Sequence, residues 1–197
     1  MLYGNYLLKG SLWILLEFQE TDLEKKIFEY QRLNKKFTNE EINKIVTRLV
    51  LGFSLLEQID IVHNDINSSN ILISGSGANI DVKIIDFDVS KFECLGMYPF
   101  NHARIMTTSW YRAPELVGKN SATFNPFKAD VYSLGLVFYQ LYDVNLDLTD
   151  INNPNKQRQL LDKVSRIDNI PIKNLLSNMF LDSSSRPTFR ELIQYLP

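Results

Sequence analysis

The side chains with chemical potential lie in two short segments near the middle of the chain. Asp65 and Asn70 are five residues apart in VHNDINSSNILI, and Asp86 directly follows the β-type run VKII. Carboxylate and amide oxygens can accept hydrogen bonds or bind hard cations, and a carboxylate can also accept a proton. An aspartate between a helix and a strand is also a common turn former, and Asp86 alone could simply end a strand. The residue types therefore leave a functional and a structural interpretation open.

Two further segments follow in the second half of the chain. They are TTSWYRAPEL at 107–116 and KADVYSLGLVFYQL at 128–141. A Trp-Tyr-Arg run usually packs in a core beside an exposed cation, so neither segment is specific by itself. The order of all four segments carries more information than any one of them.

In this order the segments resemble the C-terminal lobe of a eukaryotic-type protein kinase. HNDINSSN resembles the HRDxxxxN catalytic loop, DFD resembles the metal-binding DFG, and Ala113-Pro114-Glu115 matches APE. DVYSLG resembles the central helix of that lobe. The resemblance covers about residues 1–195, and TSWYRAPEL is most similar to the proline-directed serine/threonine kinases.

The resemblance implies phosphoryl transfer from ATP to a serine or threonine hydroxyl. Asp65 would be the catalytic residue, because it would orient the acceptor hydroxyl and take its proton. Asn70 and Asp86 would bind Mg²⁺ against the ATP phosphates, and both are hard oxygen ligands. The implied cofactors are thus ATP and Mg²⁺.

Other positions of the family pattern imply structural support for this site. Thr108 would buttress the catalytic aspartate, and Asp130 would bond backbone amides of the catalytic loop. Glu115 and Arg186 would form a buried ion pair, in which the loss of one partner is costly.

The segment LLEF at 15–18 resembles the strand and hinge that meet adenine. By that resemblance, Glu17 and Gln19 would present backbone groups to the nucleotide. A plain edge strand explains the same residues almost as well.

The chain also departs from the family pattern. It contains no GxGxxG motif, and only about 14 residues precede LLEF, so we interpret 1–18 as a shortened N-lobe and 19–197 as the C-lobe. Asn64 replaces the arginine of HRD, and Asn67 replaces a lysine expected near the γ-phosphate. Asp88 replaces the glycine of DFG. The loss of positive charge should weaken catalysis.

Three hypotheses follow from this mixed pattern. The first is an impaired protein kinase-like phosphotransferase, and the second is a pseudokinase that acts as a scaffold or allosteric partner. The third is a partial gene product whose N-lobe lies upstream. A shortened N-lobe would leave apolar surface, so we expect a protein substrate or a protein partner that covers it.

The hydrophobic periodicity predicts a mainly α fold with a small β part (α+β). Two strands are expected in 1–18 around the turn Lys9-Gly10-Ser11, and the pattern then becomes helical. A capping box at Thr38 and Glu41 begins a buried helix. The remaining expected elements are strands at 70–74 and 82–87, a long loop at 88–110, and helices at 130–142, 156–166, 171–180 and 188–195.

Composition narrows the class of protein. The 197 residues are 45% hydrophobic and carry a formal net charge of −2, which argues against a chain-wide nucleic-acid surface. No apolar run approaches the length of a membrane span. Cys94 is the single cysteine, so an internal disulfide is excluded. We expect an intracellular protein, cytoplasmic or nuclear, with no nucleic-acid or membrane partner.

Overall fold

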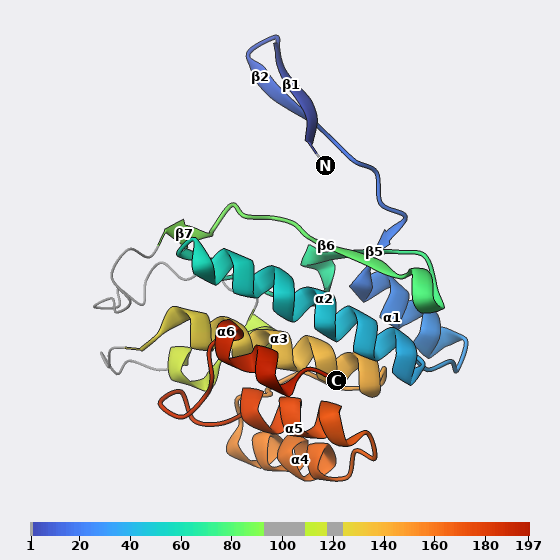
Figure 1. Ribbon diagram of the computed structural model, residues 1–197, viewed down its shortest axis with the longest axis vertical. Coiled ribbons are helices and arrows are strands. Elements are labelled where there is room, and N and C mark those ends of the chain that lie inside the picture. The colour runs from blue at the N-terminus through green and yellow to red at the C-terminus, as the bar shows by residue number, and fades with distance from the viewer. Residues whose placement is uncertain (1, 93–108, 118–123) are drawn as a thin grey trace.

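The computed structural model describes residues 2–92, 109–117 and 124–197. Within these ranges the fold is mainly α with a small β part, which confirms the predicted fold class (Figure 1). Helices form the body of the molecule, and an N-terminal hairpin extends away from it. Three small sheets occur in the described ranges, with the strand orders β1-β2, β3-β5-β6 and β4-β7.

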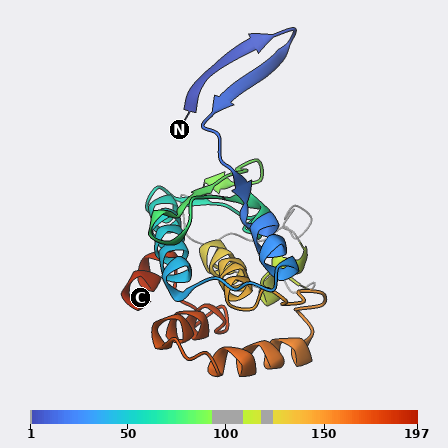
Figure 2. The same cartoon turned by 90° about the vertical axis from the view of Figure 1, so that its right-hand side faces the viewer.

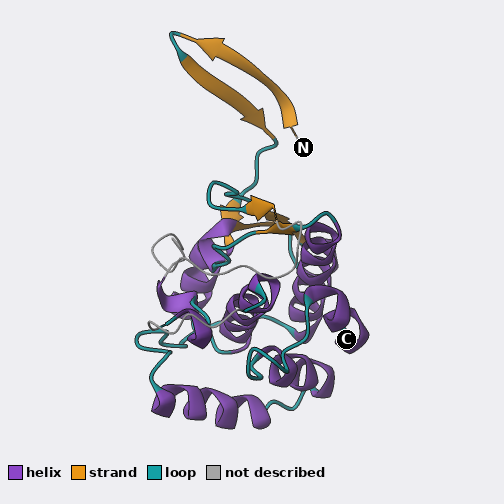
Figure 3. Cartoon of the chain, turned by 90° about the vertical axis from the view of Figure 1, so that its left-hand side faces the viewer, coloured by secondary structure: helices purple, strands orange, loops and turns teal. Residues whose placement is uncertain are grey.

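The N-terminal hairpin is the one that the sequence predicts. Strands β1 (Leu2–Leu8) and β2 (Ser11–Leu16) pair antiparallel. Lys9 and Gly10 form the turn with φ values of 50° and 78°, which suit a two-residue hairpin connection. Figure 3 shows a single connecting segment between this hairpin and the helical body.

Two helices follow the hairpin and begin at side-chain caps. Helix α1 (Leu23–Arg32) begins after Asp22, whose carboxylate accepts a hydrogen bond from the third residue of the helix. Helix α2 (Asn39–Gln58) begins at the predicted capping box, in which the side chains of Thr38 and Glu41 each bond the other residue's backbone amide. One face of α2 is buried, as its periodicity predicts. Its buried apolar residues are Ile42, Ile45, Val46, Leu49, Val50 and Phe53.

The three-stranded sheet supports the loops that carry the candidate site. It consists of β3 (Thr21–Asp22), β5 (Ile71–Ser74) and β6 (Asp81–Ile84), all antiparallel to their neighbours. The strand expected over 82–87 is shorter at its C-terminal end than the apolar run suggests. Asp86 has a φ of 65°, and this left-handed conformation takes the chain out of the extended path.

The connections around this sheet also differ from expectation. A 3₁₀ turn (Ser68–Asn70) precedes β5, so the strand begins one residue later than predicted. The expected loop at 88–110 contains a short strand, β7 (Lys91–Phe92), which pairs with β4 (Ile61–Val62). Two residues of ladder are too short to produce a visible alternation in the sequence. Residues 93–108 lie outside the described part of the chain.

Helix α3 (Pro126–Tyr142) occupies the centre of the helical body. Figure 2 looks along it and shows α2 on one side and the C-terminal helices below. The helix begins four residues earlier than the predicted 130–142, because Asn125 caps it and Pro126 suits its first turn. Its side chains are buried around almost the whole circumference, which is why its sequence lacks a polar stripe.

Helices are present at all three predicted C-terminal positions. They are α4 (Pro154–Ser165), α5 (Ile170–Met179) and α6 (Phe189–Leu192). The last prediction is only partly right, because α6 ends after one turn and continues as a 3₁₀ turn (Ile193–Tyr195).

The loop between β5 and β6 offers a test of this architecture. Gly75 and Gly77 both have left-handed φ values, 74° and 52°. A β-carbon at Gly75 would overlap the carbonyl oxygen of Asn79, whereas one at Gly77 would meet open space. Gly77→Ala should therefore cost about 1 kcal/mol of unfolding free energy, and Gly75→Ala at least about 2 kcal/mol. Urea denaturation of the two matched variants measures this, and equal losses would contradict the described loop.

Candidate active site

The loop between β4 and β5 is held by the buried carboxylate of Asp130 on α3. This side chain is only 4% exposed. It accepts the backbone amide of His63 at 2.9 Å and that of Asn64 at 3.2 Å. Buried amides require such an acceptor, so Asp130 fixes where the loop begins relative to the central helix.

Asp65 and Asn70 lie in contact at the two ends of this loop. The Asn70 side-chain amide donates to the Asp65 carboxylate at 3.0 Å and to the Asp65 carbonyl oxygen at 2.9 Å. Asn70 is buried, and Asp65 is half-buried. The two residues that the sequence singles out at a spacing of five are therefore neighbours in space, with one face of Asp65 held by Asn70.

Asn67 shapes the loop between them, a role that the sequence does not reveal directly. Its side-chain oxygen accepts the backbone amides of Ser69 at 3.0 Å and Asn70 at 3.2 Å, and its amide donates to the Asp65 carbonyl oxygen. The side chain is 4% exposed. The pattern Asn-Ser-Ser-Asn is a possible signal for such a turn, because asparagine readily bonds the backbone two residues ahead.

His63 connects this loop to the segment that carries Asp86. Its Nδ1 accepts the Asp65 backbone amide at 3.3 Å, so its Nε2 carries the proton and donates to the Ile85 carbonyl oxygen at 3.0 Å. Burial lowers the pKa of His63, against the opposing effects of its bond to Ile85 and the charges of Asp65 and Asp86. The imidazole is therefore neutral at pH 7 and acts as a fixed connector.

Asp86 lies at the same end of the β5–β6 ladder as Asn70. The backbone amide of Ile85, the residue before Asp86, donates to the Asn70 carbonyl oxygen at 3.0 Å. Asp86 is exposed and has a left-handed backbone, a conformation that is often found at functional sites. The ladder thus places Asn70 and Asp86 close along adjacent strands, although no side-chain bond between them fixes a shared geometry.

The side-chain oxygens of Asn70 and Asp86 suit a cation that takes its other ligands from water and a phosphate substrate. Asn70 uses its amide nitrogen on Asp65, and its Oδ1 accepts no hydrogen bond from the described residues. In the described part of the chain, no three His, Cys, Asp or Glu side chains cluster as a metal site. An amide oxygen and the Asp86 carboxylate are too few for a structural metal but suit Mg²⁺, which keeps water and phosphate ligands.

Tyr111 ties the TSWYRAPEL segment to the loop and to α3. Its hydroxyl lies 2.8 Å from the hydroxyl of Ser68 and donates to the Gln140 side chain at 2.7 Å. The Ser133 hydroxyl donates to the Tyr111 carbonyl oxygen at 2.7 Å. This contact was not predicted, because its partners come from three segments far apart in the sequence.

Glu115, at the end of the segment TSWYRAPEL, forms an ion pair with Arg186, which follows α5. One Arg186 nitrogen lies 2.5 Å from Glu115 Oε1, and a second lies 3.2 Å from Oε2. The Arg186 side chain is 2% exposed and also donates to the carbonyl oxygens of Lys128 and Leu181. The guanidinium thus connects the segment after Tyr111 to α3 and to the end of α5.

The remaining predicted residues lie elsewhere. Glu17 is half-buried between β2 and β3, and the Lys83 ammonium at 2.5 Å lowers the pKa of Glu17 to about 2. The side-chain oxygen of Gln19 is buried without a hydrogen-bond partner in the described ranges. Thr108 falls outside the described residues.

Comparison with known proteins identifies the family. A family model described as the protein kinase domain matches residues 1–196. The chain belongs to the protein kinase family. This confirms the resemblance and the kinase-like fold implied by the four sequence segments.

Relatives of this kinase-family chain include serine/threonine-protein kinases. It is 34% identical over 150 residues to serine/threonine-protein kinase pakH of Dictyostelium discoideum, over 76% of this chain and 27% of that protein. It is 32% identical over 133 residues to cell division control protein 2 homolog 3 of Trypanosoma brucei brucei, over 67% of this chain and 39% of that protein. The chain therefore spans less than two fifths of the length of these relatives.

A solved structure shares the fold. The crystal structure of the yeast RNA Pol II CTD kinase CTDK-1 complex contains a chain that matches with a TM-score of 0.74 and 18% identity. The match covers 98% of this chain and 73% of that one.

Among the described residues, every helix falls short of the length or apolar character that a bilayer span requires.

The protonation of Asp130 gives the first prediction for the site. Burial, helped by the charge of Asp65 and opposed by the two amide bonds, raises the pKa of Asp130 from 3.8 to about 7. The folded protein then binds a proton that the unfolded chain releases, so this contribution to stability is present at acid pH and is lost as the pH rises toward 7. The variant Asp130→Asn does not titrate. It also loses one oxygen that accepts a backbone amide, which should lower the unfolding free energy by about 1–3 kcal/mol.

Urea denaturation of the wild type and Asp130→Asn at a series of pH values measures this effect. We expect the difference in unfolding free energy to be largest at and below about pH 4 and to shrink as the pH rises to about 7. A difference that grows with pH would mean that the bonds from His63 and Asn64 outweigh burial and hold Asp130 ionised.

The Glu115–Arg186 pair gives the second prediction. Arg186→Met leaves Glu115 and two carbonyl oxygens without their donor, and should cost about 3–5 kcal/mol. Arg166→Met is a matched control, because Arg166 bonds Asp162 at 2.7 Å but is 73% exposed. The control should cost less than about 1 kcal/mol. Equal losses in thermal or urea unfolding would contradict the structural role of Arg186.

Proposed function

We propose that this chain is a protein kinase-like phosphotransferase that moves the γ-phosphate of ATP to a serine or threonine hydroxyl. The observation that carries the proposal is the contact between Asp65 and Asn70, with Asp86 at the same end of the adjacent ladder. Family membership supports the reaction type, and the serine/threonine kinase relatives support the acceptor class.

Asp65 would act on the acceptor hydroxyl. One side of its carboxylate is held by Asn70, which restricts its rotation and leaves it half-exposed toward a substrate. A positioned carboxylate of this kind orients the hydroxyl and takes its proton as the oxygen attacks phosphorus. Asp65 is therefore the catalytic residue of the proposal.

Asn70 and Asp86 would bind ATP through Mg²⁺. When bound, the ion supplies the positive charge that neutralises the phosphate oxygens. Asn70 would contribute its Oδ1, and Asp86 its exposed carboxylate. Backbone groups of Glu17 and Gln19 would meet the adenine, as the family resemblance implies.

The loop chemistry supports impaired rather than full activity. Asn67 stands where the family pattern has a lysine, and its buried side chain is used to bond the loop backbone. It therefore contributes no positive charge toward a γ-phosphate, where charge stabilisation matters most. Asp88 adds a negative charge two residues after Asp86. This same observation favours the alternative, a pseudokinase that acts as a scaffold or allosteric partner.

The N-terminal hairpin supports the proposal of a protein partner. Tyr6 and Trp13 stack across the strands with ring centroids 6.3 Å apart, yet they are 53% and 52% exposed. Leu7 and Leu12, which pair on the opposite face, are 73% and 63% exposed. Strands that are apolar on both faces are normally covered on both, so a protein that packs on this hairpin would bury a large apolar area.

Transfer from radiolabelled ATP to a mixture of basic protein substrates tests the function. We expect slow, magnesium-dependent transfer by the wild type, and a loss of about 100-fold or more in Asp65→Asn and Asp86→Asn. Asparagine tolerates the left-handed backbone at 86, so the second variant should keep its fold. Asp162→Asn, on the exposed face of α4, should retain the wild-type rate.

A thermal-shift titration distinguishes the alternative. Magnesium-dependent stabilisation by ATP without any transfer would favour a nucleotide-binding pseudokinase. Transfer that persists unchanged in both site variants would rule out the assigned residues. Neither transfer nor stabilisation would favour a scaffold and contradict the proposed activity.

A further inference from the structure

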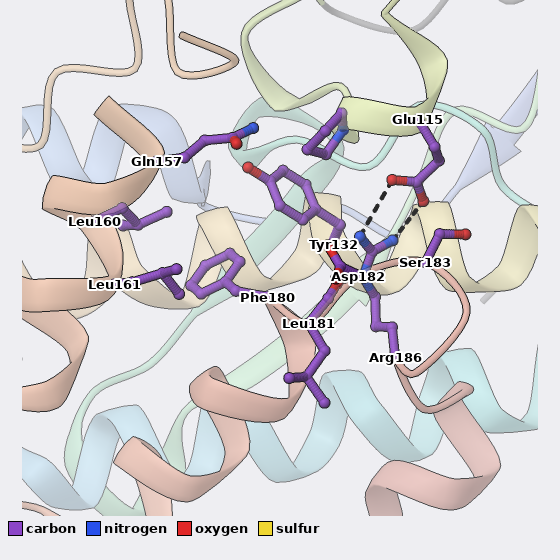
Figure 4. A pocket seen from close by; sticks show the side chains of 11 residues that line it. Glu115, Tyr132, Gln157, Leu160, Leu161, Phe180, Leu181, Asp182, Ser183 and Arg186 are labelled. Carbon is purple, nitrogen blue, oxygen red and sulfur yellow. Dashed lines mark hydrogen bonds and ion pairs between the residues drawn. The ribbon is translucent and has the colours of Figure 1, made fainter. Parts of the chain in front are cut away.

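A cavity of about 250 Å³ is lined in part by Tyr132 and Arg186 (Figure 4). Its walls come from α3, α4, the turn at 114–115 and the segment 180–186. Asp65, Asn70 and Asp86 are not among its lining residues. The cavity is therefore separate from the candidate active site.

One side of the cavity is apolar. Leu160, Leu161, Phe180 and Leu181 line it, and the rings of Phe180 and Tyr132 meet edge to face at 5.4 Å. An apolar protein cavity of about 150 Å³ is large enough for benzene. This cavity therefore has room for one six-membered ring with a small substituent.

The other side carries two polar atoms without partners. Tyr132 is only 3% exposed, and its hydroxyl oxygen has no hydrogen-bond partner among the described residues. The side-chain nitrogen of Gln157 is also buried, and the described part of the chain offers it no partner. In Figure 4 the Tyr132 hydroxyl and the Gln157 amide point toward one another. A contact with the Gln157 side chain opposes the rise in the pKa of Tyr132, but within the described residues neither the Tyr132 oxygen nor the Gln157 nitrogen has a partner at normal hydrogen-bond distance and angle.

Buried polar groups without partners are costly, so the two atoms favour a ligand that bonds both. The Gln157 nitrogen can only donate, whereas the Tyr132 hydroxyl can donate or accept. A single hydroxyl oxygen satisfies both, since it accepts from Gln157 and donates to Tyr132. Such an oxygen on a ring would leave the ring against the apolar wall.

The charges around the cavity favour a neutral ligand. Glu115 and Arg186 neutralise each other in their ion pair, and Asp182 adds a further carboxylate to the lining. An anionic ligand would therefore meet an uncompensated negative group. Burial raises the pKa of Tyr132 to about 12, so its hydroxyl keeps its proton at pH 7.

We propose that this cavity is a binding site for a phenol group, with its oxygen between Tyr132 and Gln157 and its ring against Leu160 and Phe180. The group can be a free small phenol or the side chain of a tyrosine in a peptide. The proposal does not depend on phosphotransfer activity.

The test is a titration of the full chain with ¹³C-labelled leucine methyl groups, observed by NMR at Leu160, Leu161 and Leu181. The probes are p-cresol, toluene and N-acetyl-tyrosinamide. We expect p-cresol to shift these methyl signals at saturable concentrations and toluene to bind about tenfold more weakly, because it lacks the hydroxyl. Binding by N-acetyl-tyrosinamide would identify a tyrosine side chain as a competent source, and binding by p-cresol alone would restrict the site to small phenols.

Matched variants assign the polar contacts. Tyr132→Phe and Gln157→Met should each weaken p-cresol binding about tenfold and leave toluene binding unchanged. Tyr139→Phe is the control, because this buried tyrosine lies on the same helix but does not line the cavity. If Tyr132→Phe fails to fold, Gln157→Met on the rim carries the test alone.

Three results would overturn the proposal. The first is an absence of methyl shifts with p-cresol, and the second is equal binding of toluene and p-cresol. The third is unchanged p-cresol binding in both cavity variants. Each would mean that Tyr132 and Gln157 satisfy each other or water, and that the cavity does not select a hydroxylated ring.

Discussion

The burial of one carboxylate inside the helical body is the constraint on which the site geometry depends. Asp130 belongs to the central helix, whose position is fixed by apolar packing on nearly every side. Through two backbone amides it transmits that position to His63 and Asn64, and from there to Asp65. The position of the loop therefore depends on the apolar packing that fixes α3.

The sequence identified the reactive groups better than the bonds that place them. Asp65 and Asn70 can be found from the sequence because the family motif that contains them is one contiguous stretch. A single turn of the chain brings them into contact. In the sequence Asn67 stands out only as a departure from the expected lysine, because its bonds to the loop backbone depend on dihedral angles that residue types do not specify. The roles of His63 and Tyr111 depend on partners far away in the chain, which a single sequence does not reveal.

Among the helices, strands and turns, too, those set by neighbouring residues can be predicted, and those that depend on backbone conformation or distant contacts cannot. The capping box at Thr38 and the turn at Lys9-Gly10 are local, so their residues predict them directly. The end of β6 is not local, because the apolar run continues past Ile84 while the left-handed Asp86 redirects the chain. The break after α6 is equally hidden, since apolar spacing alone does not distinguish an α-helix from a 3₁₀ turn.

The projecting hairpin has a consequence for how these 197 residues behave at high concentration. Within the described residues, β1 and β2 pair only with each other, so both outer edges offer free amides and carbonyls to another extended chain. A formal net charge of −2 supplies little long-range repulsion between copies. Colloidal stability at neutral pH therefore depends more on whether another chain covers this hairpin than on electrostatic repulsion.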